Sequence, residues 1–167
     1  MLKKYDEIQN SEEIKPLLNK ISIFGGLNNS QIDEMLGLLK TVKYEEGEYI
    51  YKRGEVQSHI YIIKQGEVKM VLEDKNIYVE LVSFKQGDCF GETSVIGIQK
   101  HSSSALAVAP TELIVIEPMK LQKLFESNKE IFGLLILNIA RETARRLHHS
   151  NEVLVNNLLL IDKKRNG

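Results

Sequence analysis

Residues 90–104 read FGETSVIGIQKHSSS, a segment whose residue types suit a phosphorylated sugar. A glycine lets the backbone approach a ligand closely, and the carboxylate of Glu92 can accept hydrogen bonds from neighbouring hydroxyl groups. The serine hydroxyls and backbone amides that end the segment suit a phosphate. The same letters also fit a strand end followed by a polar loop, so the rest of the chain has to decide between the two.

Composition describes one ordinary domain. The chain has 167 residues, of which 43% are hydrophobic and 27% are charged. Its 22 basic and 23 acidic residues give a net charge of −1, which provides no general attraction to nucleic acid or to an acidic membrane. The single cysteine, Cys89, excludes an internal disulfide and is expected to fill the core. The longest apolar run, from Ile131 to Leu137, is too short for a bilayer, so we expect a soluble cytoplasmic protein.

Two short helices are expected near the N-terminus. Ser11 is a candidate cap for a helix that runs towards Asn19. Ser30 with Asp33 is a candidate capping pair for a second helix. The apolar residues assigned to this second helix are Ile32, Met35, Leu36 and Leu39.

From about residue 40 the pattern changes to short β-like runs that are punctuated by glycines. No helix separates these runs, which favours a small antiparallel barrel over a parallel sheet. Gln65–Gly66 and the polar tip at Lys75–Asn76 are predicted to be hairpin turns that join neighbouring strands. The runs are VKYEE, EYIYKR, HIYIIK, EVKMVLE, YVELVSF, SALAVA and ELIVIE.

The pattern becomes helical again after Pro118. The stretch PMKLQKLFES suits a short helix, and Ser127 with Glu130 forms a capping box that is expected to begin a long one. Eight residues of the long helix, spaced alternately three and four apart, form an a/d heptad stripe, here called the seam. With Asn151 at an a position, the seam favours a parallel homodimer, although packing on the chain's own domain is the alternative for its first turns. The seam residues are Leu137, Ala140, Ala144, Leu147, Asn151, Leu154, Leu158 and Ile161.

Residues for catalysis or for a metal site are not recognisable. The histidines at 59, 101, 148 and 149 form no His-x-His pair, which argues against a cupin-type metal enzyme. There is no Ser-His-Asp candidate with a nucleophile turn and no Walker glycine loop. We therefore expect no enzyme activity, no catalytic or metal-binding residues, and no cofactor.

The order of these features resembles the cyclic nucleotide-binding domain. The resemblance is closest to the bacterial catabolite-activator family, because ARRLHHSNE at 144–152 is similar to that family's dimer helix. It implies a mainly β fold, a double-stranded β-helix (jelly-roll) barrel with N-terminal helices and a long C-terminal dimerisation helix. The implied boundaries are 1–127 for the helical lead-in and barrel, 128–161 for the long helix, and 162–167 for a tail. Residues 90–104 would be the phosphate cassette.

The resemblance also implies a role for each site residue. Gly91 offers a backbone amide, Glu92 accepts from the ribose 2′-hydroxyl, and the short helix at 92–97 adds its dipole towards the phosphate. Ser102 and Ser103 meet the phosphate, whereas the nucleobase falls to positions 150 and 151 of the long helix. The implied ligand-binding residues are Gly91, Glu92, Thr93, His101, Ser102, Ser103, Ser150 and Asn151.

One departure concerns the phosphate. The family's proline-arginine pair falls on Lys100–His101, so the guanidinium is missing. A charge-assisted hydrogen bond contributes about 1.5–3 kcal/mol, so its loss costs roughly one to two decades of affinity. His101 would compensate if a bound phosphate kept it cationic, and Lys100 could reach in as a point charge. The alternative is that both residues lie on a solvated loop tip.

Three hypotheses remain. The first is a homodimeric sensor that binds cAMP, cGMP or a related anionic nucleotide and signals through its long helices to an unknown downstream protein. The second is a degenerate domain that has lost its ligand and serves dimerisation or protein interaction. The third keeps the pocket but fills it with another anion or with a haem, for which His101 would be a candidate ligand. Because the sequence ends at DKKRNG, we expect no helix-turn-helix and no direct DNA binding.

Overall fold

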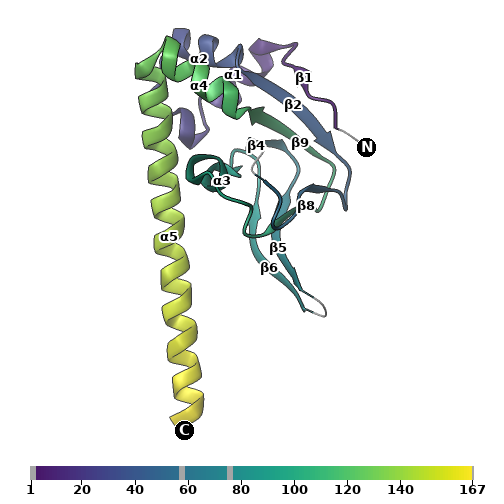
Figure 1. Ribbon diagram of the computed structural model, residues 1–167, viewed down its shortest axis with the longest axis vertical. Helices are drawn as coiled ribbons and strands as arrows, with labels where there is room; N and C mark the ends of the chain where they lie inside the picture. The colour runs from purple at the N-terminus through teal and green to yellow at the C-terminus, as the bar shows by residue number, and fades with distance from the viewer. Residues whose placement is uncertain (1–2, 57–58, 75–76, 167) are drawn as a thin grey trace.

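Two antiparallel sheets and a cap of helices make up the computed structural model, which describes residues 3–56, 59–74 and 77–166 (Figure 1). The strands are β1 (Asp6–Glu7), β2 (Leu39–Tyr44), β3 (Tyr49–Tyr51), β4 (Ile60–Gln65), β5 (Val68–Asp74), β6 (Ile77–Phe84), β7 (Cys89–Phe90), β8 (Ser104–Ala107) and β9 (Thr111–Ile116). The helices are α1 (Ser11–Leu18), the 3-10 turn η1 (Ser22–Phe24), α2 (Asn29–Leu36), α3 (Glu92–Gly97), α4 (Pro118–Ser127) and α5 (Lys129–Asn166).

The sheet topology is that of a jelly roll. The first sheet has the order β1-β2-β9-β4-β7 and the second has the order β3-β8-β5-β6. Each strand pair that the structure describes is antiparallel. The predicted mainly β fold with flanking helices is therefore confirmed.

The first sheet is buried on both faces, which explains the continuous apolar runs of its central strands. Ile60 and Ile62 of β4 pack with the helices, whereas Tyr61 and Ile63 between them pack against the second sheet. Strand β9 alternates in the same way. Because side chains alternate along a strand, the two faces of the first sheet contribute to two separate hydrophobic cores. The helix α3 therefore follows a strand, β7, of a sheet that is packed on both faces.

One predicted hairpin is wrong. Gln65–Gly66 joins β4 to β5, which lie in different sheets, because β4 pairs with β7 and β9 rather than with the next strand. Gly66 has a φ of +99°, and a Cβ there would lie 2.4 Å from Oγ1 of Thr111, so this crossing requires glycine. The pairing of β5 with β6 is confirmed, although the predicted tip at Lys75–Asn76 lies outside the described residues.

The predicted helix caps are also wrong, each by one or two residues. The side chain of Asn10 accepts from the backbone N–H of Glu13, and Asn28 forms a reciprocal capping box with Gln31. Asparagine is as good a cap as serine, so neighbouring candidates compete, and the packing of the helix selects between them. Asn10, Asn28 and Asn128 take the places predicted for Ser11, Ser30 and Ser127. Leu39, which we had assigned to the second helix, begins β2.

The long helix α5 runs far past the sheets (Figure 1). It covers 38 residues and continues to Asn166, through most of the tail expected at 162–167. All eight seam residues are exposed, including Leu147 at 62% and Leu158 at 56%. Among the described residues, no helix has both the length and the apolar character needed to cross a membrane.

Candidate functional site

The turn into α3 needs glycine. Gly91 follows β7 and has a φ of +82°, and a Cβ added there would lie 2.7 Å from the carbonyl oxygen of His59. A real Cβ does not tolerate such a contact, and residues with side chains rarely adopt this φ. The turn thus fixes the start of α3, where the side chain of Glu92 is buried.

A hollow of about 320 Å³, here called the α3 hollow, lies beside the start of this helix. Its volume falls at the lower end of the range for small-molecule sites, roughly 300–1,000 Å³. Aromatic and apolar side chains form one wall, and polar groups from the cassette and α5 form the rest. The lining residues are Tyr51, Met70, Val82, Phe84, Phe90, Gly91, Glu92, Thr93, Ser94, His101, Ser102, Ser103, Arg146 and Ser150.

The structure brings together all the predicted binding residues except Asn151. Three segments that are far apart in sequence contribute: the start of α3, the loop before β8, and α5. Ser150 lies one helical turn after Arg146, so both residues face the α3 hollow. Asn151 instead lines a shallow surface hollow with His148 and Val155. Asn151 is exposed and does not line the α3 hollow.

Glu92 is held by an arginine that the sequence analysis missed. Nη1 of Arg146 donates to Oε1 of Glu92 at 3.0 Å, and Nε of the same guanidinium lies 3.4 Å from Oε1 of Glu142. The guanidinium also lies over the ring of Phe84, 4.9 Å from its centroid. Arg146 therefore joins α5 to the cassette and to β6. The sequence signal was present, because Arg146 belongs to ARRLHHSNE, but its partner lies 54 residues away.

Two opposing effects act on the pKa of the Glu92 carboxyl group. Burial raises its pKa, and the positive charge of Arg146 opposes this rise. Its second oxygen, Oε2, is buried and has no hydrogen-bond partner among the described residues. An unpaired buried acceptor is rare in proteins, so this oxygen is available to a hydroxyl group inside the α3 hollow.

His101 is buried, at 4% exposure, so the alternative of a solvated loop tip is wrong for this residue. Its ring stacks on Tyr51 with centroids 3.6 Å apart, and its backbone N–H donates to the carbonyl oxygen of Glu55. Burial lowers its pKa, although the charge of Glu55 opposes this effect. Nε2 of His101 is buried and lacks a hydrogen-bond partner within the described chain. Lys100, the other candidate cation, is exposed.

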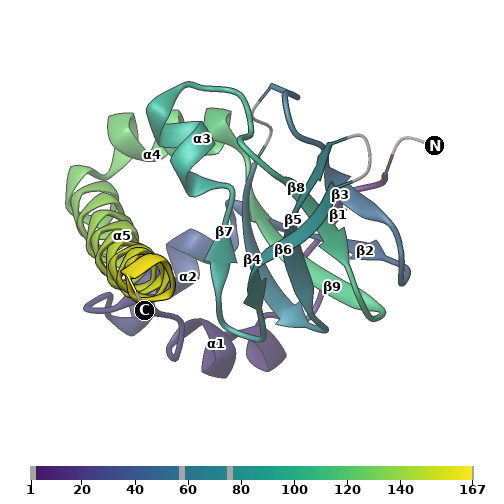
Figure 2. The ribbon, with the colours of Figure 1, turned by 90° about the horizontal axis from the view of Figure 1, so that it is seen from below.

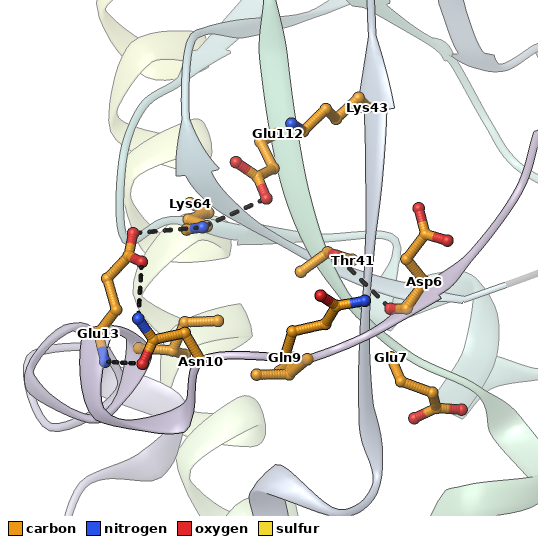
Figure 3. A pocket seen from close by; sticks show the side chains of 11 residues that line it. Asp6, Glu7, Gln9, Asn10, Glu13, Thr41, Lys43, Lys64 and Glu112 are labelled. Carbon is orange, nitrogen blue, oxygen red and sulfur yellow. Dashed lines mark hydrogen bonds and ion pairs between the residues drawn. The ribbon is translucent and has the colours of Figure 1, made fainter.

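A second hollow, of about 390 Å³, is lined by the start of α1 and by strands β1, β2, β4 and β9 of the first sheet (Figure 3). Nζ of Lys64 lies 3.2 Å from Glu112 and 3.7 Å from Glu13, so the charges compensate one another. None of the unpartnered buried side-chain atoms in the described part of the chain belongs to this N-terminal hollow. The α3 hollow is therefore the stronger candidate site.

Known proteins share this domain. Residues 41–128 match the family model described as "Cyclic nucleotide-binding domain". A cGMP-dependent protein kinase of Plasmodium berghei is 37% identical over 56% of this chain, and the human cyclic nucleotide-gated channel beta-1 is 30% identical over 81% of it. The chain spans only about a tenth of each relative, 10% and 11% respectively.

Two solved structures show the same architecture. A cyclic nucleotide-binding domain from Methylobacillus flagellatus superposes with a TM-score of 0.81 at 18% identity, covering 93% of this chain and 88% of that one. The catabolite activator protein of Thermus thermophilus gives a TM-score of 0.70 at 26% identity, covering 80% of this chain and 61% of that one.

We predict that Arg146→Gln destabilises the protein by about 1–3 kcal/mol at pH 8 and by less at pH 5. The folded-state pKa of Glu92 is raised, so stability falls as the pH rises from the ordinary glutamate pKa, about 4.3, through the folded-state pKa. Removing Arg146 raises that folded-state pKa further and extends the loss towards neutral pH. Denaturant unfolding at the two pH values measures the difference.

Arg145→Gln is the matched control, because Arg145 is 66% exposed and should change the free energy of unfolding by less than about 0.5 kcal/mol. Adding Glu92→Gln to Arg146→Gln should abolish the extra loss at pH 8. An equal loss at both pH values in the single variant would show that Arg146 acts through packing rather than through the Glu92 charge.

Proposed function

The chain belongs to the cyclic nucleotide-binding domain family, and we propose that its α3 hollow binds a cyclic nucleotide, cAMP or cGMP, as a regulatory signal. The carrying observation is that Glu92 Oε2 and His101 Nε2, two buried atoms without partners among the described residues, line the same hollow. Buried polar atoms are nearly always paired, which supports a polar ligand between them. A sugar hydroxyl and a phosphate would supply the two missing partners.

In the proposed complex, the ribose 2′-hydroxyl donates to Glu92, with the backbone of Gly91 and Thr93 beside it. The cyclic phosphate meets Ser102 and Ser103, together with Nε2 of His101. Ser150, which lines the hollow from α5, would meet the nucleobase. Asn151, on the seam, would approach a nucleobase only across a dimer interface.

The proposed regulatory step uses the link between Glu92 and Arg146. A ribose hydroxyl that donates to Glu92 binds the same carboxylate as Arg146. A nucleotide bound in the hollow would therefore change how α5 is attached to the cassette. A ligand shifts a conformational equilibrium only through contacts that differ between the two states, and this ion pair is a specific source of such a difference. The proposed role is thus regulatory rather than catalytic, with a downstream protein as the partner.

The alternative is a domain of the same fold that has lost its ligand and serves protein interaction. The observation that favours it is His101, which stands at the position of the family's arginine and whose pKa is lowered by burial. A thermal-shift panel separates the two functions, because a nucleotide at a concentration 100 times its Kd stabilises the folded state by about 2.7 kcal/mol. Absence of a shift with both cAMP and cGMP, even at pH 6, would favour the degenerate domain.

We predict that cAMP and cGMP bind more tightly at pH 6 than at pH 8. In the free protein, burial lowers the His101 pKa, whereas a bound phosphate raises it. Affinity therefore increases as the pH falls through the bound-state pKa, and it levels off below the free-state pKa. Isothermal titration calorimetry at the two pH values should show a difference of about tenfold, since a charge-assisted hydrogen bond contributes about 1.5–3 kcal/mol.

His101→Gln should remove this pH dependence and leave the weaker affinity at both pH values. Glu92→Gln is the matched control, because it should weaken binding through the ribose while the pH dependence of His101 stays. Glu55 also faces His101, and Glu55→Gln should lower the affinity at pH 6 only slightly. A pH dependence that survives in His101→Gln would contradict the role given to this ring.

We also propose a parallel homodimer through the seam. The last three seam residues, Leu154, Leu158 and Ile161, are apolar and exposed, at 56%, 56% and 55%. An a/d stripe of this kind buries its apolar surface when two helices pair. Asn151, at an a position, would pair with its symmetry mate and fix the parallel two-stranded register.

The dimer is tested with two leucines of nearly equal exposure. Leu158 lies on the seam and Leu160, at 57%, lies off it. Leu158→Ser should weaken the dimer about tenfold or more, whereas Leu160→Ser should leave its dissociation constant within about twofold. Sedimentation velocity over a concentration series gives both constants. Equal effects of the two substitutions would show that the heptad assignment is wrong.

A further inference from the structure

The short helix α3 borders an apolar groove as well as the α3 hollow. The groove, of about 520 Å³, lies between α3 and α5, and it shares only Glu92 and Thr93 with the α3 hollow. Thr93 and Ile96 of α3 form one wall. The other wall includes Ile136, Ala140, Ala144 and Leu147 of α5. Figure 2, which looks along α5, shows α3 beside this helix.

One exposed isoleucine lines the groove on its α3 side and a second follows the helix outside the groove lining. Ile96 is 46% exposed and Ile98, just after the helix, is 81% exposed. Ile98 has a φ of +50° and is the single non-glycine residue with positive φ among the described residues. A β-branched residue rarely adopts this conformation, which costs free energy. Exposed apolar side chains around an apolar groove are typical of an interaction surface.

The groove is continuous with the seam. Ala140, Ala144 and Leu147 belong both to the groove wall and to the a/d stripe of α5. Alanines at a/d positions bury little side-chain area, but they let a partner helix approach closely. A closely packed partner helix also covers the residues that flank the seam, so at the alanines it reaches over the groove. The apolar contact area that the small side chains of Ala140 and Ala144 do not provide would thus come from α3.

We infer that this groove receives α5 of a second copy of the chain, which places α3 itself in the dimer interface. The inference rests on the homodimer proposed above. In a parallel pair, each g position lies next to an e position of the other helix. Ile136 and Thr143 are g positions of the groove wall, so Arg141 of the second copy lies at the groove, and its aliphatic stem covers apolar surface there.

This arrangement couples the second copy to the nucleotide. Glu92 and Thr93 line both the groove and the α3 hollow, so one helix of six residues would contact both the ligand and the second copy. Coupling of two binding events through one element is reciprocal. Occupancy by cAMP or cGMP therefore changes the dimer dissociation constant, and dimerisation changes nucleotide affinity by the same factor.

The first test is Ile96→Ser, measured by sedimentation velocity without nucleotide. Ile96 does not line the α3 hollow, and we expect the substitution to weaken the dimer about tenfold through lost apolar burial. Met119→Ser is the matched control, because Met119 of α4 is 75% exposed and does not line the groove, so it should change the constant by less than about twofold. Circular dichroism checks that both variants are folded.

The results for these variants distinguish a failure of the groove inference from a failure of the proposed dimer. If Leu158→Ser weakens the dimer and Ile96→Ser does not, the dimer stands and the groove is not part of it. If the unmodified chain is monomeric at every concentration, both proposals fail. If Ile96→Ser and Met119→Ser have equal effects, the α3 surface has no special part in association, and the inference is overturned.

Cross-linking tests the position of the second copy directly. Arg141 lies on the flank of α5 opposite to the groove, so a cysteine there can reach Ile96→Cys only from the second copy. Mixing differently tagged Ile96→Cys and Arg141→Cys chains with a short bis-maleimide should give a cross-linked heterodimer. Met119→Cys in place of Ile96→Cys should give none. Cys89 stays silent because it is buried and burial raises its pKa to about 12. Absence of the Ile96–Arg141 product would contradict the inference.

Discussion

The ion pair between Glu92 and Arg146 is the contact on which the rest of the site depends. A carboxylate at 2% exposure is costly without a cation, and the guanidinium of α5 supplies it across 3.0 Å. The pair leaves one carboxylate oxygen free inside the α3 hollow. The carboxylate that fixes the long helix to the cassette is therefore also the group that a ligand in the hollow would contact.

The sheets make this contact possible by holding its two ends in place. Because the first sheet is packed on both faces, β7 and the Gly91 turn have little freedom, and the start of α3 is set. The N-terminal half of α5 is fixed in turn by Ile131, Leu135 and Ile139, which belong to the core beneath the helices. Beyond these residues α5 is held by Arg146, and then it leaves the domain with its apolar seam exposed.

The sequence predicted features that depend on local pattern and missed those that depend on distant partners. Strand runs, the proline start of α4, the long helix and the residues of the cassette follow from periodicity, turn chemistry and the family resemblance. The pairing of β4 with β9 rather than with β5 does not follow from these local signals, because strands with the same local sequence pattern can pair with different neighbours. The predicted cap residues were wrong because nearby serine and asparagine residues cap a helix with nearly equal free energies. Arg146 and the buried state of His101 required three-dimensional neighbours, Glu92 and Tyr51, that no spacing indicates.

The central claim is that one ligand bridges Glu92 and His101 while Arg146 ties the site to α5. Chemical-shift mapping by NMR on the nitrogen-labelled chain, titrated with cAMP and with cGMP, tests this claim most directly. We predict that the largest shifts occur at the backbone amides of Gly91, Ser102 and Ser103 and at Nε of Arg146. Shifts confined to the N-terminal hollow around Lys64, or no shifts at saturating nucleotide, would contradict it.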